Sequence, residues 1–76
     1  MDKLRIRNNI RRLRFNNNEM TQQQLADRAG VTRQTIVTME KEKYSPSLEL
    51  AFKISMVFEL PLEDVFYHEI EESEKK

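Results

Sequence analysis

Cysteine is absent from this sequence of 76 residues, which excludes disulfide bonds and metal sites built on thiolates. Tryptophan is absent too, and the single histidine, His68, falls on the inward face of a predicted terminal strand. A lone histidine of this kind is more often structural than catalytic or metal-binding. The sequence also has neither a glycine-rich phosphate loop nor a carboxylate pair suited to a pocket. We therefore expect no enzymatic activity, no cofactor and no metal site.

Long apolar runs are missing as well. The N-terminus has no apolar stretch like that of a secretory signal, and no stretch of about 20 apolar residues could span a bilayer. These absences predict a cytoplasmic protein without a membrane partner. The length fits one domain, which we place at residues 1–70, followed by a disordered charged tail over 71–76. A chain this short buries only about 60% of its unfolded surface, so a second copy would add useful core.

The net charge of zero conceals an uneven distribution. Residues 1–38 hold eight Lys and Arg against three Asp and Glu, whereas residues 39–76 hold five against ten. The two halves therefore carry +5 and −5. Such a chain can present a basic face to a polyanion and keep its acidic groups elsewhere, although the charges could also be interspersed after folding.

Both ends of the domain show the alternation of a β-strand. LRIRN (residues 4–8) and FYHEIE (66–71) alternate apolar with polar side chains. Antiparallel pairing of the two would put Leu4, Ile6 and Ile70 on one face and set arginine against glutamate on the other. Frayed termini are the alternative.

Between these ends, the spacing of apolar residues predicts five helices. The first covers about residues 8–17. The other four begin at the capping or turn residues Thr21, Thr32, Ser47 and Pro61. The polar segment EKEKYSPS predicts a loop between the third and fourth helices.

The chain has one glycine, Gly30, which lies between the second and third predicted helices. A glycine in the left-handed conformation ends a helix without a clash of its own Cβ. Thr21 and Gln24 have the spacing of a capping box before it, and Thr32 is a candidate N-cap after it. Two helices joined by about three residues that include a glycine have helix-turn-helix spacing.

The segments TQQQLADRAGVTRQTIVTMEK and YSPSLELAFKISMVFELPLEDVF resemble the phage-repressor and Cro-like helix-turn-helix regulators, most of all their small bacterial and archaeal members. The resemblance runs from about Asn8 to Phe66. It implies an all-α fold of five helices, to which the termini would add a short two-stranded β-sheet. It also implies a transcriptional regulator, typically a repressor, that reads a palindromic operator in double-stranded DNA as a homodimer.

A protein-interaction module of the same fold, such as an antitoxin, is the alternative function. The acidic C-terminal half could engage a basic partner. In either case a protein partner could carry the regulatory signal, because no sensor domain is evident in the sequence.

The resemblance places base-reading residues on the third helix. Arg33 could form a bidentate pair with guanine, Gln34 could do so with adenine, and Val37 or Thr38 could touch a thymine methyl group. The alternative for these residues is an ordinary solvated helix surface.

Predicted phosphate contacts surround these base readers. Gln22 stands at the start of the second helix, where its amide and the helix dipole favour an anion. Thr32 and Thr35 could donate hydroxyl groups, although Thr32 could equally serve only as a cap. Lys43 and Tyr44, in the loop after the third helix, could bind adjacent phosphates, although a loop lysine is usually just solvated.

The family commonly pairs a glutamate at the position of Glu40 with an arginine of the first helix. Arg14 is the best candidate, but RFNNNEM is one residue longer than usual, so Arg11 stays open. A partly buried pair would fix the first helix on the third. A surface pair, worth under about 1 kcal/mol, is the alternative.

The C-terminal part of the domain carries more apolar residues than a monomer of this size needs. We expect them to form the dimer contact, or otherwise only to close the core. They are Phe58, Leu60, Leu62, Val65, Phe66 and Tyr67. Phe52 and Met56 are expected to pack inside the domain.

Overall fold

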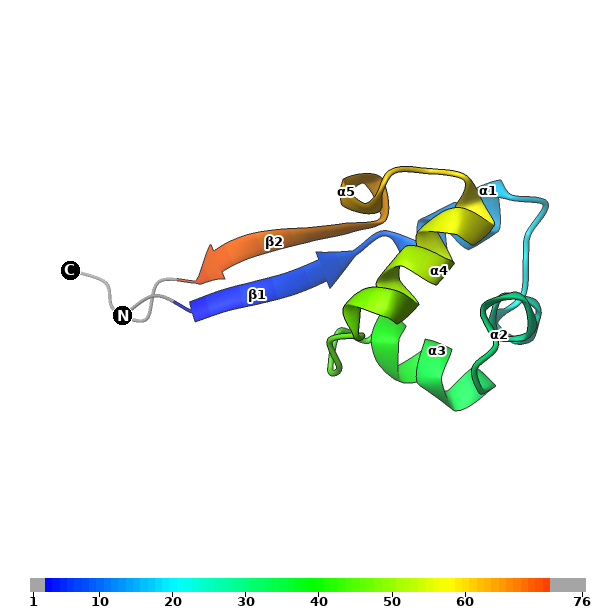
Figure 1. Cartoon of the computed structure of the whole chain (residues 1–76), viewed down its shortest axis with the longest axis horizontal. Helices are drawn as coiled ribbons and strands as arrows, with labels where there is room; N and C mark the ends of the chain where they lie inside the picture. The colour runs from blue at the N-terminus through cyan, green and yellow to red at the C-terminus, as the bar shows by residue number, and fades with distance from the viewer. Residues whose placement is uncertain (1–2, 72–76) are drawn as a thin grey trace.

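The computed structural model of the chain describes residues 3–71. The order of elements is β1 (Lys3–Asn8), α1 (Ile10–Asn16), α2 (Gln22–Ala29), α3 (Arg33–Glu40), α4 (Leu48–Phe58), α5 (Leu62–Val65) and β2 (Phe66–Glu71). The helices form a body at one end, and the two strands leave it as a ribbon, so the molecule is 45 Å long and 21 Å across (Figure 1). Five helices with a two-stranded sheet from the two ends are therefore confirmed.

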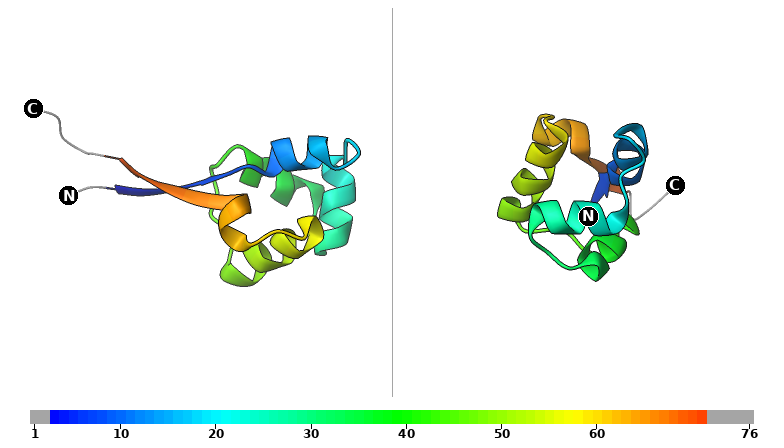
Figure 2. Two further views of the ribbon diagram at one scale, coloured as in Figure 1. Left: turned by 90° about the horizontal axis from the view of Figure 1, so that it is seen from above. Right: turned by 90° about the vertical axis from the view of Figure 1, so that its right-hand side faces the viewer.

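The ribbon pairs β1 with β2 in antiparallel fashion, with Leu4 opposite Ile70 and Arg5 opposite Glu69. Figure 2 shows the two strands side by side along their length, away from the helices. The predicted antiparallel pairing is confirmed, with an apolar pair at Leu4–Ile70 and an arginine opposite a glutamate at Arg5–Glu69. The structure differs from the prediction at His68, which lies opposite Ile6 but is exposed.

The core lies where the helices meet. All five helices and the start of β2 contribute to it or border it. Its fully buried large side chains are Ile10, Leu25, Ile36, Met39, Ile54 and Val65. None of the helices in residues 3–71 combines the length and the apolar character that a membrane span needs.

Local capping explains where α2, α3 and α4 begin. Thr21 and Gln24 form the predicted capping box, in which the Thr21 hydroxyl accepts from the Gln24 amide at 3.0 Å and the Gln24 side chain accepts from the Thr21 amide at 2.9 Å. The hydroxyl of Thr32 accepts from the Thr35 amide, and that of Ser47 accepts from the Leu50 amide. The predicted starts of these three helices are confirmed.

Gly30 ends α2 in the left-handed conformation, with a φ of 74°. A Cβ built on Gly30 would meet no atom within 4 Å, so steric space does not demand a glycine at this position. The backbone conformation alone demands it. Glu59 ends α4 in the same conformation, with a φ of 58°, although it carries a side chain.

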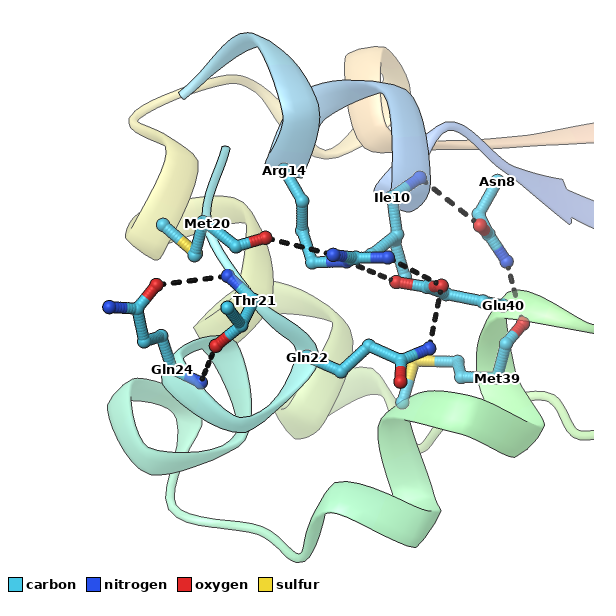
Figure 3. A network of polar contacts seen from close by, with 9 residues as sticks. All are labelled: Asn8, Ile10, Arg14, Met20, Thr21, Gln22, Gln24, Met39 and Glu40. Atoms are coloured by element: carbon cyan, nitrogen blue, oxygen red, sulfur yellow. Dashed lines mark hydrogen bonds and ion pairs between the residues drawn. The ribbon is translucent and has the colours of Figure 1, made fainter. Parts of the chain in front are cut away.

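A buried ion pair holds α1 against α3 (Figure 3). Arg14 donates from Nε to Glu40 Oε2 at 2.6 Å and from Nη2 to Oε1 at 3.0 Å. Its Nη1 donates to the carbonyl oxygen of Met20 at 2.8 Å. The side chains of Arg14 and Glu40 are 14% and 9% exposed. Arg14 rather than Arg11 is therefore the partner of Glu40, and the pair is not a surface pair.

A second polar cluster ties the ribbon to the end of α3, and the sequence did not predict it. Arg7 pairs with Glu42 at 2.7 Å and with Glu69 at 2.8 Å, while the Asn8 side chain donates to the Met39 carbonyl oxygen at 2.9 Å. The hydrogen bond to Glu69 and the charges of both glutamates raise the pKa of Arg7 above its ordinary value. An arginine stays protonated in any case, so Arg7 keeps its positive charge between the two carboxylates and links the ribbon to the loop after α3.

Two boundaries differ from the prediction. The fifth helix ends at Val65, because Phe66 already belongs to β2. Glu71 also belongs to β2, so it is not part of a tail. The rest of the predicted tail, 72–76, lies outside the described residues.

The predicted packing of Phe52 and Met56 is wrong. Together with Leu48, they form an exposed apolar stripe along α4 at a spacing of four residues. Their neighbours Leu50, Ala51 and Ile54 occupy the inner face of the helix instead.

Gly30 and Glu59 provide a matched pair of stability tests. Gly30→Ala is expected to lower the free energy of unfolding by about 1 kcal/mol, because the left-handed conformation strains an L residue. Glu59→Gly is expected to raise it by up to about 1 kcal/mol for the same reason. Urea unfolding followed by circular dichroism measures both. Two changes of the same sign would contradict the assignment.

The buried ion pair is also testable. Glu40→Leu is expected to lower the free energy of unfolding by about 3–5 kcal/mol, because Arg14 would keep a buried charge without its carboxylate. Lys53→Ala is the control, since it removes an exposed pair with Glu49 at 3.5 Å and should cost less than about 0.5 kcal/mol. Equal losses in the two variants would rule out a special role for the buried pair.

Candidate nucleic-acid interface

The α2–α3 unit is assembled by small and branched apolar residues on its inner side. Ala26 and Ile36 are fully buried, and Val31 in the connection is partly buried against the core. The Val31 amide donates to the Ala26 carbonyl oxygen at 3.0 Å, which closes the turn after α2. With Ile36 and Met39 facing inward, the remaining sides of α3 face outward.

The predicted base-reading residues all lie on these outer sides of α3. Arg33 and Gln34 are exposed, and Val37 and Thr38 are partly exposed. The ion pairs formed within residues 3–71 involve the cations Arg7, Arg14 and Lys53, and Arg33 takes part in none of them. The structure therefore brings the four residues together, with the cationic one at the N-terminal end of the helix.

Two of these residues are linked by hydrogen bonds within α3. The side-chain amide of Gln34 donates to the Thr38 hydroxyl at 3.2 Å, and that hydroxyl donates to the backbone carbonyl oxygen of Gln34 at 2.9 Å. These bonds hold the exposed amide against the helix surface. One amide N–H and the amide oxygen of Gln34 remain as donor and acceptor, which is the pair that adenine requires.

The threonines at the start of α3 have mainly a capping arrangement. The Thr32 hydroxyl accepts from the Thr35 amide at 3.2 Å and lies 3.0 Å from the Thr35 hydroxyl. Of the two roles considered for Thr32, the structure contains the cap. Tyr44 joins these residues, because it lines a shallow hollow of about 300 Å³ with Thr32, Gln34, Thr35 and Thr38.

The loop after α3 keeps Lys43 close to the same surface. The Lys43 amide faces the Thr38 carbonyl oxygen at 3.4 Å, and its side chain is exposed. Glu42, just before it, adopts a φ of 61° and turns its carboxylate to Arg7. The turn at Glu42 thus directs its carboxylate toward Arg7, while the next residue, Lys43, faces outward.

Gln22 has a contact that the sequence did not suggest (Figure 3). Its side-chain amide donates to Glu40 Oε1 at 3.2 Å, so Gln22 joins the Arg14–Glu40 pair. One amide N–H stays available, and Gln22 is only partly buried. The backbone amides of the first turn of α2 also lack helical partners there, which suits an anion.

The cleft beside Gln22 contains two cations that were not among the predicted site residues. Arg11 and Lys41 line it together with Arg14, Gln22, Val37 and Glu40, and its volume is about 350 Å³. Both Arg11 and Lys41 are exposed. A phosphate at the start of α2 would therefore meet positive charge on two sides. The basic residue directly after Glu40 was the available sequence signal for Lys41.

The predicted dimer residues do not form one surface. Phe58, Val65 and Phe66 are buried in the core of their own subunit, so they offer no surface to a partner. Leu60 and Leu62 are partly buried against the same core, and Tyr67 on the ribbon is partly exposed. The alternative, closure of the core, therefore describes the buried three. Their apolar spacing was the same for either role, which is why the sequence could not separate the two.

Residues 3–71 contain no group of three or more His, Asp or Glu side chains placed to hold a metal ion. His68 stands on the ribbon, away from the α2–α3 surface.

Comparison with known proteins agrees with this geometry. A helix-turn-helix family model matches residues 10–65. An uncharacterized HTH-type transcriptional regulator of Archaeoglobus fulgidus is 54% identical over 61 residues, which cover 80% of this chain and 82% of the relative. Another of Methanocaldococcus jannaschii is 53% identical over 53 residues, covering 70% and 80%. A third, of Bacillus subtilis, is 49% identical over 51 residues, covering 67% and 77%.

The matched residues contain all five helices of the body, including the exposed face of α3, and leave out the ribbon on both sides. The chain therefore belongs to the helix-turn-helix family of DNA-binding transcriptional regulators.

Proposed function

We propose that the protein is a sequence-specific repressor that reads a palindromic operator in the major groove as a homodimer. The observation that carries the proposal is the outer face of α3, where Arg33 is exposed and unpaired with any acid of residues 3–71. Arg33 and Gln34 at the start of a recognition helix are positioned to reach base edges. Their preferred partners are guanine and adenine.

Phosphate contacts would flank this helix on both sides. Gln22 and the first turn of α2, with Arg11 and Lys41 beside them, would bind one phosphate segment. Thr35, Lys43 and Tyr44 would bind another. Contacts of this kind fix the register of the protein on the duplex, while the base contacts supply the sequence preference.

Two copies are required for a palindromic operator, because each recognition helix reads one half-site. In such dimers the half-sites are about 34 Å apart, one turn of DNA, and the protein and the operator share a two-fold axis. A dimer bound over a promoter blocks transcription by excluding the polymerase, which is why we propose repression.

A salt titration tests DNA binding of this kind. With about six phosphate contacts, the logarithm of the affinity for a palindromic operator should fall with the logarithm of salt concentration, at a slope near −5. Fluorescence anisotropy at several salt concentrations measures it. The operator comes from selection among random duplexes, and an affinity indifferent to salt would reject the proposal.

Two substitutions separate base reading from phosphate binding. Arg33→Ala is expected to lose about 1–3 kcal/mol of discrimination at one base pair of each half-site. Lys43→Ala is expected to weaken binding to all sequences alike and to lower the magnitude of the salt slope by about 1. Anisotropy with the operator and with single-base variants measures both. Unchanged base preference in Arg33→Ala would contradict the proposed recognition helix.

A further inference from the structure

The ribbon has two faces of opposite character. One face carries Leu4, Ile6, His68 and Ile70, and we name it the apolar ribbon face. The other face carries the arginines of β1, among them Arg5 opposite Glu69. On that second face Arg7 pairs with Glu69 at 2.8 Å, and its charged side chains suit contact with water. The aliphatic side chains of the apolar ribbon face cannot form such pairs.

The apolar ribbon face continues the core outward. Phe66, at the inner end of β2, is 9% exposed. Further along the ribbon, Ile6 is 36%, Ile70 is 55% and Leu4 is 58% exposed. The helical body therefore covers the inner end of this face and leaves its outer half uncovered (Figures 1 and 2). Since a two-stranded ribbon alone is marginally stable in water, an aliphatic face at its tip favours an additional covering layer.

The charge pattern of the strands limits how a second copy could provide that layer. Two-fold pairing of β1 with its own copy along the edge would set lysine and arginine against lysine and arginine. Pairing of β2 with its own copy would bring Glu69 near its counterpart. Like charges directly opposite one another destabilise a sheet. Edge-to-edge pairing is thus disfavoured on both edges, and packing of one apolar ribbon face on another is not.

We propose that the apolar ribbon face packs against the same face of a second copy of this chain. The proposal rests on the homodimer in the proposed function and gives it a surface. This surface shares β2 with Phe66 and Tyr67 of the predicted dimer contact, but it uses other side chains of the ribbon. The ribbon lies outside residues 10–65, which match the helix-turn-helix family. The surface therefore lies outside the part of the chain that the family model matches.

The link between ribbon and body makes such a pairing relevant to DNA. Arg7 joins Glu42 and Glu69, and Asn8 donates to the Met39 carbonyl oxygen at the end of α3. A partner held on the ribbon is thereby held in a fixed relation to the recognition helix.

Sedimentation equilibrium of the full chain tests the surface. The wild-type protein is expected to form dimers. Leu4→Glu on β1 and Ile70→Glu on β2 should each raise the dimer dissociation constant at least about 10- to 100-fold, the range expected from losing the burial of one aliphatic side chain. Met56→Glu is the matched control, because Met56 is also apolar and 73% exposed, but lies on α4. It should leave the dissociation constant unchanged.

A cysteine variant provides a second test of the surface if the glutamate variants fail to fold. The chain has no cysteine, so Leu4→Cys introduces one thiol on the apolar ribbon face. Under mild oxidation it should form a disulfide-linked dimer, whereas Met56→Cys should not. A monomeric wild-type protein, or a dimer lost in Met56→Glu but kept in Leu4→Glu and Ile70→Glu, would overturn the proposal.

DNA binding separates this inference from the proposed function. A folded, monomeric Ile70→Glu variant that still binds a single half-site would support both. A wild-type dimer that depends on the ribbon but binds no DNA would leave the surface standing and reject the function. A wild-type dimer that binds its operator, and that Leu4→Glu and Ile70→Glu leave intact, would reject the surface alone.

Discussion

The ion pair between Arg14 and Glu40 is the interaction on which the arrangement of the helices depends. It joins α1 to α3 directly, reaches the start of α2 through Gln22, and reaches the α1–α2 loop through the Met20 carbonyl oxygen. A buried pair of this kind contributes little net stability, because removing two charges from water offsets most of their attraction. Its bonds are directional, however, and an apolar contact is not. In a domain with so small a core, these directions define how three helices sit on one another.

The two ends of α3 lie in opposite environments. Glu40, at the C-terminal end of α3, is held in the polar cluster, while Arg33, at the N-terminal end, faces water. Glu40 lies seven positions after Arg33, or about 10 Å along the helix. Ile36 and Met39 fill the inner side between them. An internal anchor at one end therefore sets the direction in which the exposed end projects.

Local chemistry accounts for what the sequence predicted well. The capping box at Thr21, the turn at Gly30 and the cap at Thr32 involve residues at most five apart, so these features can be predicted from short stretches of the sequence. The choice of Arg14 over Arg11 depended on how α1 lies on α3, and only the folded chain decides that. The pair between Arg7 and Glu42 depends on the left-handed backbone conformation at Glu42. Glutamate has no preference for that conformation, so the sequence did not predict the pair. Periodicity on α4 identified apolar positions, but a domain this small covers only one side of the helix, so Phe52 and Met56 stay outside.

Asn8 joins the ribbon to the helical body. Asn8 donates to the carbonyl oxygen of Met39 and accepts, through its own side-chain oxygen, from the Ile10 amide at the start of α1. One asparagine thus connects the ribbon, the start of α1 and the end of α3. If two copies meet through their ribbons, the distance and angle between the two recognition helices are set by this junction rather than by a flexible linker. An operator with a fixed half-site spacing needs such a rigid relation, because a loosely joined pair would read many spacings about equally well.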